Sequence, residues 1–273
     1  MNRILSDGTT ARSTLIRTVI VVFIALWLVV PLVVVVGLSF TGQQSFAFPP
    51  TSWSLDWYDA LSDPKWITAA RNSLVIGTAT AVLAAVLGTA ASFALVRSNS
   101  RIMRSMKLLV LAPQITPVVI VGLGVYLVFL RWQMVGTYQG FVLAYTGLTL
   151  PFVVIPVTAA LETFDRNLEK ASASLGAGPL TTFWRVTFPL IRPAVLGGAV
   201  IAFLSSLDEV VIGLYLSTAQ MRTLPVEIYQ SMTDQIDPTV AAIGAVEIAF
   251  VVTGVVVALM VQRRRARLLK VEV

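Results

Sequence analysis

The sequence predicts an all-α membrane protein with six transmembrane helices, and three observations support this fold class. Of the 273 residues, 56% are hydrophobic and 12% are charged, whereas roughly a quarter of the residues in a soluble domain are charged. The apolar residues fall into six windows of about 20 residues or more, the length that a helix needs to cross a hydrocarbon core of about 30 Å. The basic residues lie between these windows and at the two ends, as in multi-pass membrane proteins.

The six predicted spans follow one another along the chain and are separated by less apolar segments. They cover residues 17–40, 69–96, 107–130, 138–161, 192–216 and 241–262. The third span contains Pro113 and Pro117, and the fourth contains Pro151 and Pro156. Because proline removes a backbone donor and clashes with the preceding turn, we expect both helices to be broken.

The distribution of Lys and Arg predicts the orientation. An even number of spans places both chain ends on one side of the membrane, and about 16 of the 20 Lys and Arg residues fall on that side. Residues 1–16 and 263–273 are therefore expected to be cytoplasmic tails of a multi-pass membrane protein. The first apolar stretch is longer than the roughly 7 to 15 residues of a cleavable signal, so we expect it to remain as an uncleaved anchor.

Residues 41–68 are expected to form a periplasmic loop with short helical turns. Trp53, Trp57, Tyr58 and Trp66 lie in this segment. Aromatic side chains gather at the headgroup level of membranes, so we expect these four to form an interfacial belt.

The composition excludes several classes of function. The chain contains no cysteine and no histidine, which removes thiolate nucleophiles, imidazole acid/base chemistry and Cys/His metal sites. Its net charge of +6 is spread over the membrane borders and forms no stripe for nucleic acid. No catalytic residue and no metal ligand is therefore predicted.

The fourth and fifth spans are joined by a long loop, residues 162–192, which is longer than most connections between packed elements. Its central part reads NLEKASASLGAGPLTTFWRVTFPLIRPAV. Gly176 permits a turn with positive φ, and Pro179 suits the first turn of a second short helix. The loop is predicted to be a helix-turn-helix outside the bilayer, and its exposed apolar residues require a partner.

The spacing from Gly176 through nine residues to Val186, followed by Phe188 and Pro189, resembles the EAA loop of binding-protein-dependent ABC permeases. That loop begins with Glu-Ala-Ala and continues with a glycine and an Ile-x-Leu-Pro ending.

The start of the loop departs from the family pattern at two positions. Lys170 stands where the family has its glutamate, and Glu169 comes one residue earlier. Ala171 keeps the first alanine, and Ser172 replaces the second. Residues from about Leu38 to Val257, including SSLDEVVIGLYLS and RTLPVEIYQSMTDQIDPTVAA, look like the spermidine/putrescine-type permeases.

The resemblance implies a type I ABC transporter transmembrane domain, residues 69–262, with a cytoplasmic coupling helix. It implies as partners a second permease subunit in a homologous heterodimer, two ABC ATPase subunits, a periplasmic solute-binding protein and the lipid bilayer. The chain would form half of the pathway for a small cationic solute such as spermidine or putrescine, although members of this subfamily also carry iron, thiamine, amino acids or opines.

The resemblance also assigns coupling to a set of loop residues. These are Glu169, Lys170, Ala171, Leu175, Gly176, Ala177, Phe183, Trp184 and Pro189. Leu175, Phe183 and Trp184 are expected to be apolar anchors in a groove of the ATPase. No GxxxxGK[ST] sequence occurs in the chain, so ATP and Mg are expected in the ATPase subunit and no cofactor in this chain.

Carboxylates within the predicted spans are the second candidate site. Asp208 and Glu209 lie late in the fifth span, and Glu247 lies in the sixth. A charged residue at the helix centre costs about 2.5 to 3.5 kcal/mol on the insertion scale, so such residues line a path or pair with a cation. Tyr215, and also Tyr229, could add cation–π contacts to a cationic solute.

Other interpretations of these features remain open. Asp208 or Glu247 could instead form an ion pair with Arg71, Arg131 or the partner permease. A secondary cation transporter would also have six spans with buried carboxylates, and a membrane scaffold without a transport role is a third reading. Neither rival accounts for the long Gly/Pro loop together with the carboxylates.

Overall fold

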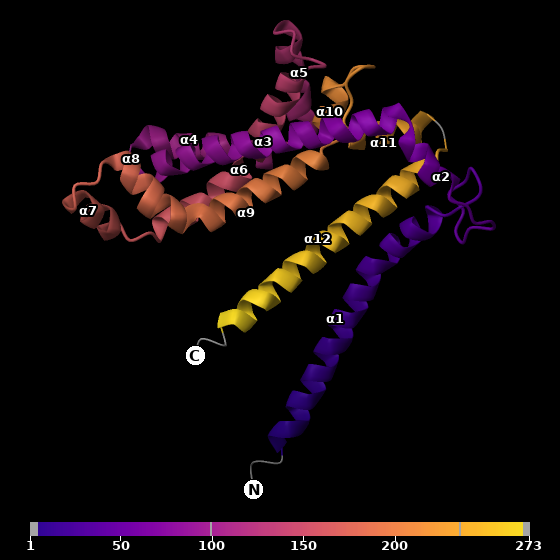
Figure 1. The fold of residues 1–273 in the computed structure, drawn as a ribbon, viewed down its shortest axis with the longest axis horizontal. Helices are drawn as coiled ribbons and strands as arrows, with labels where there is room; N and C mark the ends of the chain where they lie inside the picture. Colours follow the sequence, from indigo (N-terminus) through magenta and orange to yellow (C-terminus); the bar gives the residue numbers. More distant parts are fainter. Residues whose placement is uncertain (1–4, 99, 235, 270–273) are drawn as a thin grey trace. The chain divides into compact units, whose positions relative to one another are not determined.

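A computed structural model describes residues 5–98, 100–234 and 236–269, and the chain there is almost entirely helical (Figure 1). Within these ranges the β structure is limited to two isolated bridges. The helical elements are α1 (Leu5–Leu38), α2 (Asp56–Asp59), the 3₁₀ turn η1 (Ala60–Ser62), α3 (Pro64–Arg97), α4 (Arg101–Ile115), α5 (Val118–Arg131), α6 (Tyr138–Glu162), α7 (Asn167–Ser174), α8 (Pro179–Thr182), the π-helical η2 (Phe183–Thr187), α9 (Phe188–Leu207), α10 (Val211–Leu216), α11 (Leu224–Asp234) and α12 (Thr239–Leu269).

The chain divides into two compact units, Met1–Asp63 with Ser231–Val273, and Pro64–Gln230. In the first unit, α1 contacts α12, and the stretch Ile16–Leu38 is the most apolar of the candidate spans in the described residues. Its large side chains, such as Phe23 and Trp27, are exposed, as is expected of a helix that faces lipid.

Hydrogen bonds order the segment that follows α1. The hydroxyls of Ser39 and Tyr58 are 2.8 Å apart, and Trp57 Nε1 donates to the carbonyl of Thr41 at 2.7 Å. The elements α2 and η1 confirm the predicted short helical turns. The aromatic belt remains a prediction; Trp53 is exposed, whereas Trp66, on α3 of the second unit, is 3% exposed.

The core of the second unit is a bundle of α3, α6 and α9, which lie side by side (Figure 1). Small residues allow the close approach of these helices: an added Cβ at Gly88 would lie 2.8 Å from the Cβ of Val153, and one at Gly198 would lie 2.8 Å from the backbone oxygen of Phe152. Ser92 Oγ donates to the carbonyls of Gly88 and, at 3.2 Å, of Val154. Small residues and hydroxyls are the usual contacts between helices in membranes, where no hydrophobic force draws helices together.

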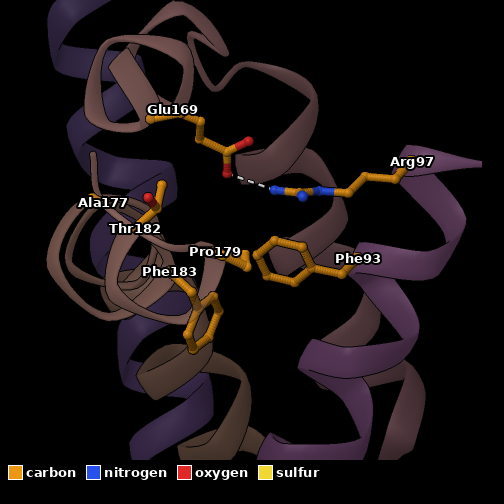
Figure 2. A pocket seen from close by; sticks show the side chains of 8 residues that line it. Phe93, Arg97, Glu169, Ala177, Pro179, Thr182 and Phe183 are labelled. Carbon is orange, nitrogen blue, oxygen red and sulfur yellow. Dashed lines mark hydrogen bonds and ion pairs between the residues drawn. The ribbon is translucent and has the colours of Figure 1, made fainter. Parts of the chain in front are cut away.

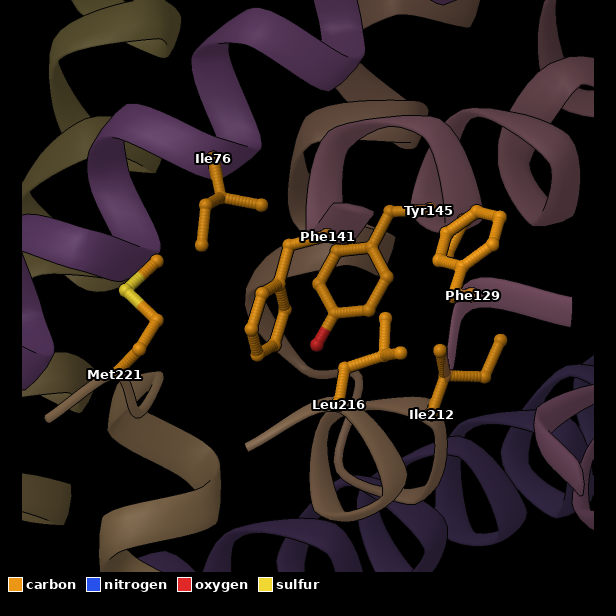
Figure 3. Close-up of a cluster of buried hydrophobic side chains, with 8 residues drawn as sticks. Ile76, Phe129, Phe141, Tyr145, Ile212, Leu216 and Met221 are labelled. Atoms are coloured by element: carbon orange, nitrogen blue, oxygen red, sulfur yellow. The ribbon is translucent and has the colours of Figure 1, made fainter. Parts of the chain in front are cut away.

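A second cluster of buried side chains lies where α10 meets α5 and α6, and it is drawn in Figure 3. Its members are Ile76, Phe129, Phe141, Ala144, Tyr145, Ile212, Leu216 and Met221. Tyr145 is fully buried, and its ring packs edge-on against Phe141 at a centroid distance of 5.8 Å. This cluster holds α10 against the end of the bundle opposite to α7 and α8.

The predicted proline break is confirmed in the third span and wrong in the fourth. In the third predicted span, α4 continues through Pro113, and the helix breaks at Pro117, where α4 and α5 meet at 107°. In the fourth, α6 is continuous through Pro151 and Pro156, so the expected break is wrong. Because α6 is packed against both α3 and α9, it lies in the setting in which membrane helices tolerate proline, where neighbouring helices help to satisfy the freed backbone groups.

The fifth predicted span, residues 192–216, is also corrected. α9 ends at Leu207, and a separate short helix, α10, begins at Val211. Residues 208–210 therefore form a break within the span.

Four helices in the described ranges are long and apolar enough to cross a membrane, and the bent pair α4–α5 makes a fifth. The sixth predicted span lies on α12, whose described apolar part, Thr239–Gly254, is shorter than a full span. The all-helical membrane fold is confirmed, and the count of six remains a prediction.

Candidate functional site

The loop between α6 and α9 has the predicted helix-turn-helix form. Gly176 adopts φ +83°, and its N–H donates to the carbonyl of Ala173 at 2.9 Å, which closes the end of α7. Pro179 opens α8. Positive φ is available to glycine without the steric cost that a Cβ imposes, so the Gly-Ala-Gly-Pro break predicted from the sequence is confirmed.

The second half of the loop runs as a π-helix, η2, directly into α9. Phe183 contacts Phe188 at a centroid distance of 5.8 Å and Phe93 of α3 at 5.5 Å. Trp184 packs edge-on against Phe188 at 5.0 Å. Phe183, expected to be an external anchor, is half-buried inside the chain and supports the loop from within.

Glu169 connects the loop to the bundle. Its Oε1 lies 2.5 Å from Nη2 of Arg97, the last residue of α3, and accepts a hydrogen bond of 2.7 Å from the hydroxyl of Thr187. Lys170, at the position of the family's glutamate, is exposed. Glu169 thus makes its ion pair within the chain.

A cavity of about 360 Å³ lies beneath this ion pair. Figure 2 shows the carboxylate of Glu169 facing the guanidinium of Arg97, with Phe93, Pro179 and Phe183 below them. The hydroxyls of Ser172 and Thr182 are 3.0 Å apart and join α7 to α8. The loop is therefore fixed on one side, toward α3.

Three large apolar side chains of the loop are exposed. Leu175 is 89% exposed, Leu180 71% and Trp184 57%. Ala171 is also exposed, as is Pro189 in the first turn of α9, whereas Ala177 lines the cavity. An apolar group held outward on an ordered loop is typical of a docking surface.

The two adjacent carboxylates of the fifth span lie at the break between α9 and α10. Glu209 Oε1 accepts a hydrogen bond of 2.9 Å from the N–H of Ile212, and the hydroxyl of Tyr145 donates to the Glu209 carbonyl at 3.0 Å. Asp208, the residue after α9, is exposed. In the described part of the chain, Asp208 pairs with neither Arg71 nor Arg131.

The other two predicted path residues are placed differently. Tyr215 of α10 is half-buried, its ring lies against Gly122, and its centroid is 6.1 Å from that of Tyr126. Glu247 is exposed on α12 and belongs to the other unit. Asp208 and Glu209 are adjacent at the helix break, and Tyr215 follows on the short helix that Glu209 caps.

Sequence reasoning missed Arg97, Thr187 and a polar group around Arg222. Arg222 Nη1 lies 3.1 Å from the carboxylate of Glu227, and its carbonyl accepts a hydrogen bond of 2.9 Å from the amide of Asn72. In the sequence analysis, Arg97 and Arg222 were only counted among the 20 Lys and Arg residues that predict the orientation. The sequence did contain one signal for Arg97. This residue directly follows the second predicted span, on the same side of the membrane as the predicted loop, so the two could meet.

Comparisons with known proteins show the family of this chain. Residues 81–267 match the family model of the binding-protein-dependent transport system inner membrane component. The molybdenum transport system permease protein ModB of Mycobacterium tuberculosis is 34% identical over 223 residues, which cover 76% of this chain and 83% of that protein. The putrescine transport system permease protein PotI of Escherichia coli is 31% identical, with 84% of each chain covered.

A solved structure supports the same fold. It is a bacterial ABC transporter involved in the import of the acidic polysaccharide alginate, with a TM-score of 0.70 at 16% sequence identity, over 93% of this chain and 97% of that chain. The family model spans more than half of the chain, and relatives above 30% identity cover most of it. The chain therefore belongs to the binding-protein-dependent inner-membrane components, the multi-pass permease subunits of ABC importers.

Proposed function

We propose that this chain forms half of the translocation pathway of an ATP-driven importer and takes up the motion of a separate ATPase through residues 162–192. The observation that carries the proposal is the exposure of three large apolar side chains, Leu175, Leu180 and Trp184, on a loop that is tied to α3. Helical segments that present such side chains dock into hydrophobic grooves of partner proteins. ATP and Mg bind in the partner, since this chain has no phosphate-binding loop.

The assembly proposed here contains this permease, a homologous second permease, two ABC ATPase subunits and a periplasmic solute-binding protein. Membership in the family supports this set of partners. The loop and both chain ends are proposed to be cytoplasmic, because the basic residues concentrate in those segments.

The proposed solute is a small cation of the polyamine class, such as putrescine or spermidine. An exposed carboxylate at a break within a membrane span, Asp208, would attract a cation and repel an anion. The similarity to ModB favours an oxyanion as the alternative solute. The two solutes have opposite charges, so they are distinguished by the residues that line the path.

Leu175→Asp is expected to lower the amount of ATPase subunit that co-purifies with the permease by about tenfold or more, because central apolar anchors contribute about 2 kcal/mol or more to interfaces. Leu175 is the most exposed apolar side chain of the loop, so the substitution leaves the fold of the permease intact. The measurement is the ratio of ATPase to permease after purification of the whole complex. Leu175→Met, which keeps the apolar volume, is the matched control, and an unchanged ratio for Leu175→Asp would contradict the proposal.

Asp208→Asn is expected to lower putrescine uptake about tenfold, since one charge at about 4 Å contributes about 1 to 4 kcal/mol in water or near a protein surface. Assembly should persist, because Asp208 has no ion pair in the described part of the chain. Glu209→Gln should also reduce uptake while the amide oxygen still accepts the hydrogen bond from Ile212. Glu247→Gln should have the smallest effect.

Uptake of radiolabelled putrescine and of molybdate by cells with the whole importer, together with the yield of purified complex, separates the outcomes. Loss of complex in Asp208→Asn would indicate an ion pair with the partner permease. Normal putrescine uptake in all three variants, or uptake of molybdate alone, would overturn the cationic solute.

A further inference from the structure

The end of α3 is tied to the α7–η2 loop by three different contacts. Nη2 of Arg97 pairs with Glu169, Arg166 donates to the carbonyl of Val96 at 3.2 Å, and the ring of Phe93 meets that of Phe183 edge-on. The guanidinium carbon of Arg97 also lies 4.8 Å from the centroid of Phe93, within the range of a cation–π contact. Arg97 is thus held between a carboxylate and an aromatic face.

Glu169 is shared between three elements. The same oxygen, Oε1, accepts from Arg97 of α3 and from Thr187 of η2, while Glu169 itself belongs to α7. Thr187 is almost fully buried. One carboxylate therefore joins α3, the first loop helix and the π-helical start of α9.

Arg97 is the last residue of α3, which is a central helix of the second unit. α3 contacts both α6 and α9 along its length, and its N-terminal part supplies Asn72 and Ser73 to the polar contacts around Arg222 and Leu224. A displacement of α3 along its axis would therefore reach both ends of the second unit.

We propose that Arg97 is a positioning residue that makes α3 and the coupling loop move as one body, through its ion pair with Glu169. The inference rests on the proposed coupling function of the loop, and it adds a residue that the loop motif does not contain. When the ATPase displaces the exposed apolar side chains of the loop, Glu169 transmits the displacement to Arg97 and hence to α3. η2 supports this role, because π-helical segments are local irregularities that often lie at functional sites.

The Arg97–Glu169 ion pair fixes the position of the loop and contributes little to the folding stability of the permease. The side chain of Arg97 is 51% exposed and that of Glu169 21%, and partly exposed ion pairs contribute little to folding. Removal of the pair should leave the α3, α6 and α9 bundle assembled and release only the loop. This expectation separates a positioning role from a structural one.

The test uses the absence of cysteine in this chain. Spin labels are attached to cysteines introduced at Ser174 of the loop and at Leu87 of α3, both of which are exposed. The label-to-label distance is measured by pulsed dipolar spectroscopy in the purified permease and in the whole complex. The complex is measured with and without a non-hydrolysable ATP analogue. The wild-type background should give one narrow distance that the nucleotide does not change. Arg97→Ala should reduce the population at that distance about two- to fivefold relative to displaced populations, the factor expected for a partly exposed pair.

Arg97→Lys should retain most of the narrow population, and the charge exchange Arg97→Glu with Glu169→Arg should restore it. Arg185→Ala removes an exposed cation from the same loop and should leave the distance unchanged. A wild-type distance distribution in Arg97→Ala, or a charge exchange no better than Arg97→Ala, would overturn the proposal. Failure of the coupling function itself would show separately, as normal ATPase retention in Leu175→Asp, because the distance in the purified permease does not depend on the ATPase.

Discussion

Gly198→Val is expected to remove most of the folded permease from the membrane. A Cβ at Gly198 would lie 2.8 Å from the backbone oxygen of Phe152 and 2.8 Å from the Cα of Val153. Backbone atoms of α6 cannot rotate away as a side-chain end can, so α9 would have to separate from α6. Overpacking in a core costs about 1 to 3 kcal/mol and sometimes more, and this is a large fraction of a stability of about 5 to 15 kcal/mol.

The adjacent glycine supplies the matched control. Gly197 is exposed, and a Cβ there would meet nothing within 4 Å, so Gly197→Val should leave the protein level and the thermal midpoint in detergent close to those of the wild type. Both are measured by size-exclusion chromatography of heated, detergent-solubilised protein. Equal midpoints for the two variants would show that α6 and α9 are not packed as described.

Gly176→Val is expected to produce a permease that folds but no longer holds its ATPase. The residue has φ +83° and nothing lies within 4 Å of an added Cβ, so the effect comes from backbone strain alone. Strained φ/ψ regions cost about 1 to 3 kcal/mol, and because the loop is more easily displaced than the bundle, the turn should open and move Leu175. ATPase co-purification and uptake should then fall about tenfold, the factor for about 1.4 kcal/mol.

A graded series tests the cause. Gly176→Asn should be milder than Gly176→Val, since Asn tolerates positive φ better than a β-branched residue, and Gly176→Pro should be as severe as Gly176→Val because proline cannot adopt positive φ. Gly178→Ala is the control, since Gly178 has φ −71° and an added Cβ would meet nothing within 4 Å. Retained ATPase and normal uptake in Gly176→Val would refute the coupling role of this turn.

Local signals in the sequence predicted the elements that depend on local chemistry. The positive φ at Gly176 and the helix start at Pro179 follow from the conformations open to these two residues. Leu175 and Trp184 were predicted as apolar anchors of the loop, and both are exposed. The fold class followed from composition, since a helix must satisfy its own backbone hydrogen bonds in lipid.

The break at residues 208–210 and the continuous α6 were not predicted, because hydropathy is insensitive to both. An apolar window has the same mean hydropathy whether or not the helix within it is interrupted. The effect of Pro151 and Pro156 depends on the helices packed beside them. In a membrane span nearly every residue is apolar, so the pattern does not tell which face is buried.

The sequence by itself determined that this chain is a helical membrane protein with an ordered helix-turn-helix loop, because chain length, hydropathy and the conformations of glycine and proline are local properties. Only the tertiary structure decided what holds that loop. Arg97 and Glu169 are far apart in the chain. Glu169 accepts a hydrogen bond from Thr187, which lies in a π-helical turn that the sequence pattern did not predict. Such a pairing depends on how far the end of α3 and the loop before α9 lie along the bundle axis. These positions are set by the packing of Gly88 of α3 and Gly198 of α9 against α6.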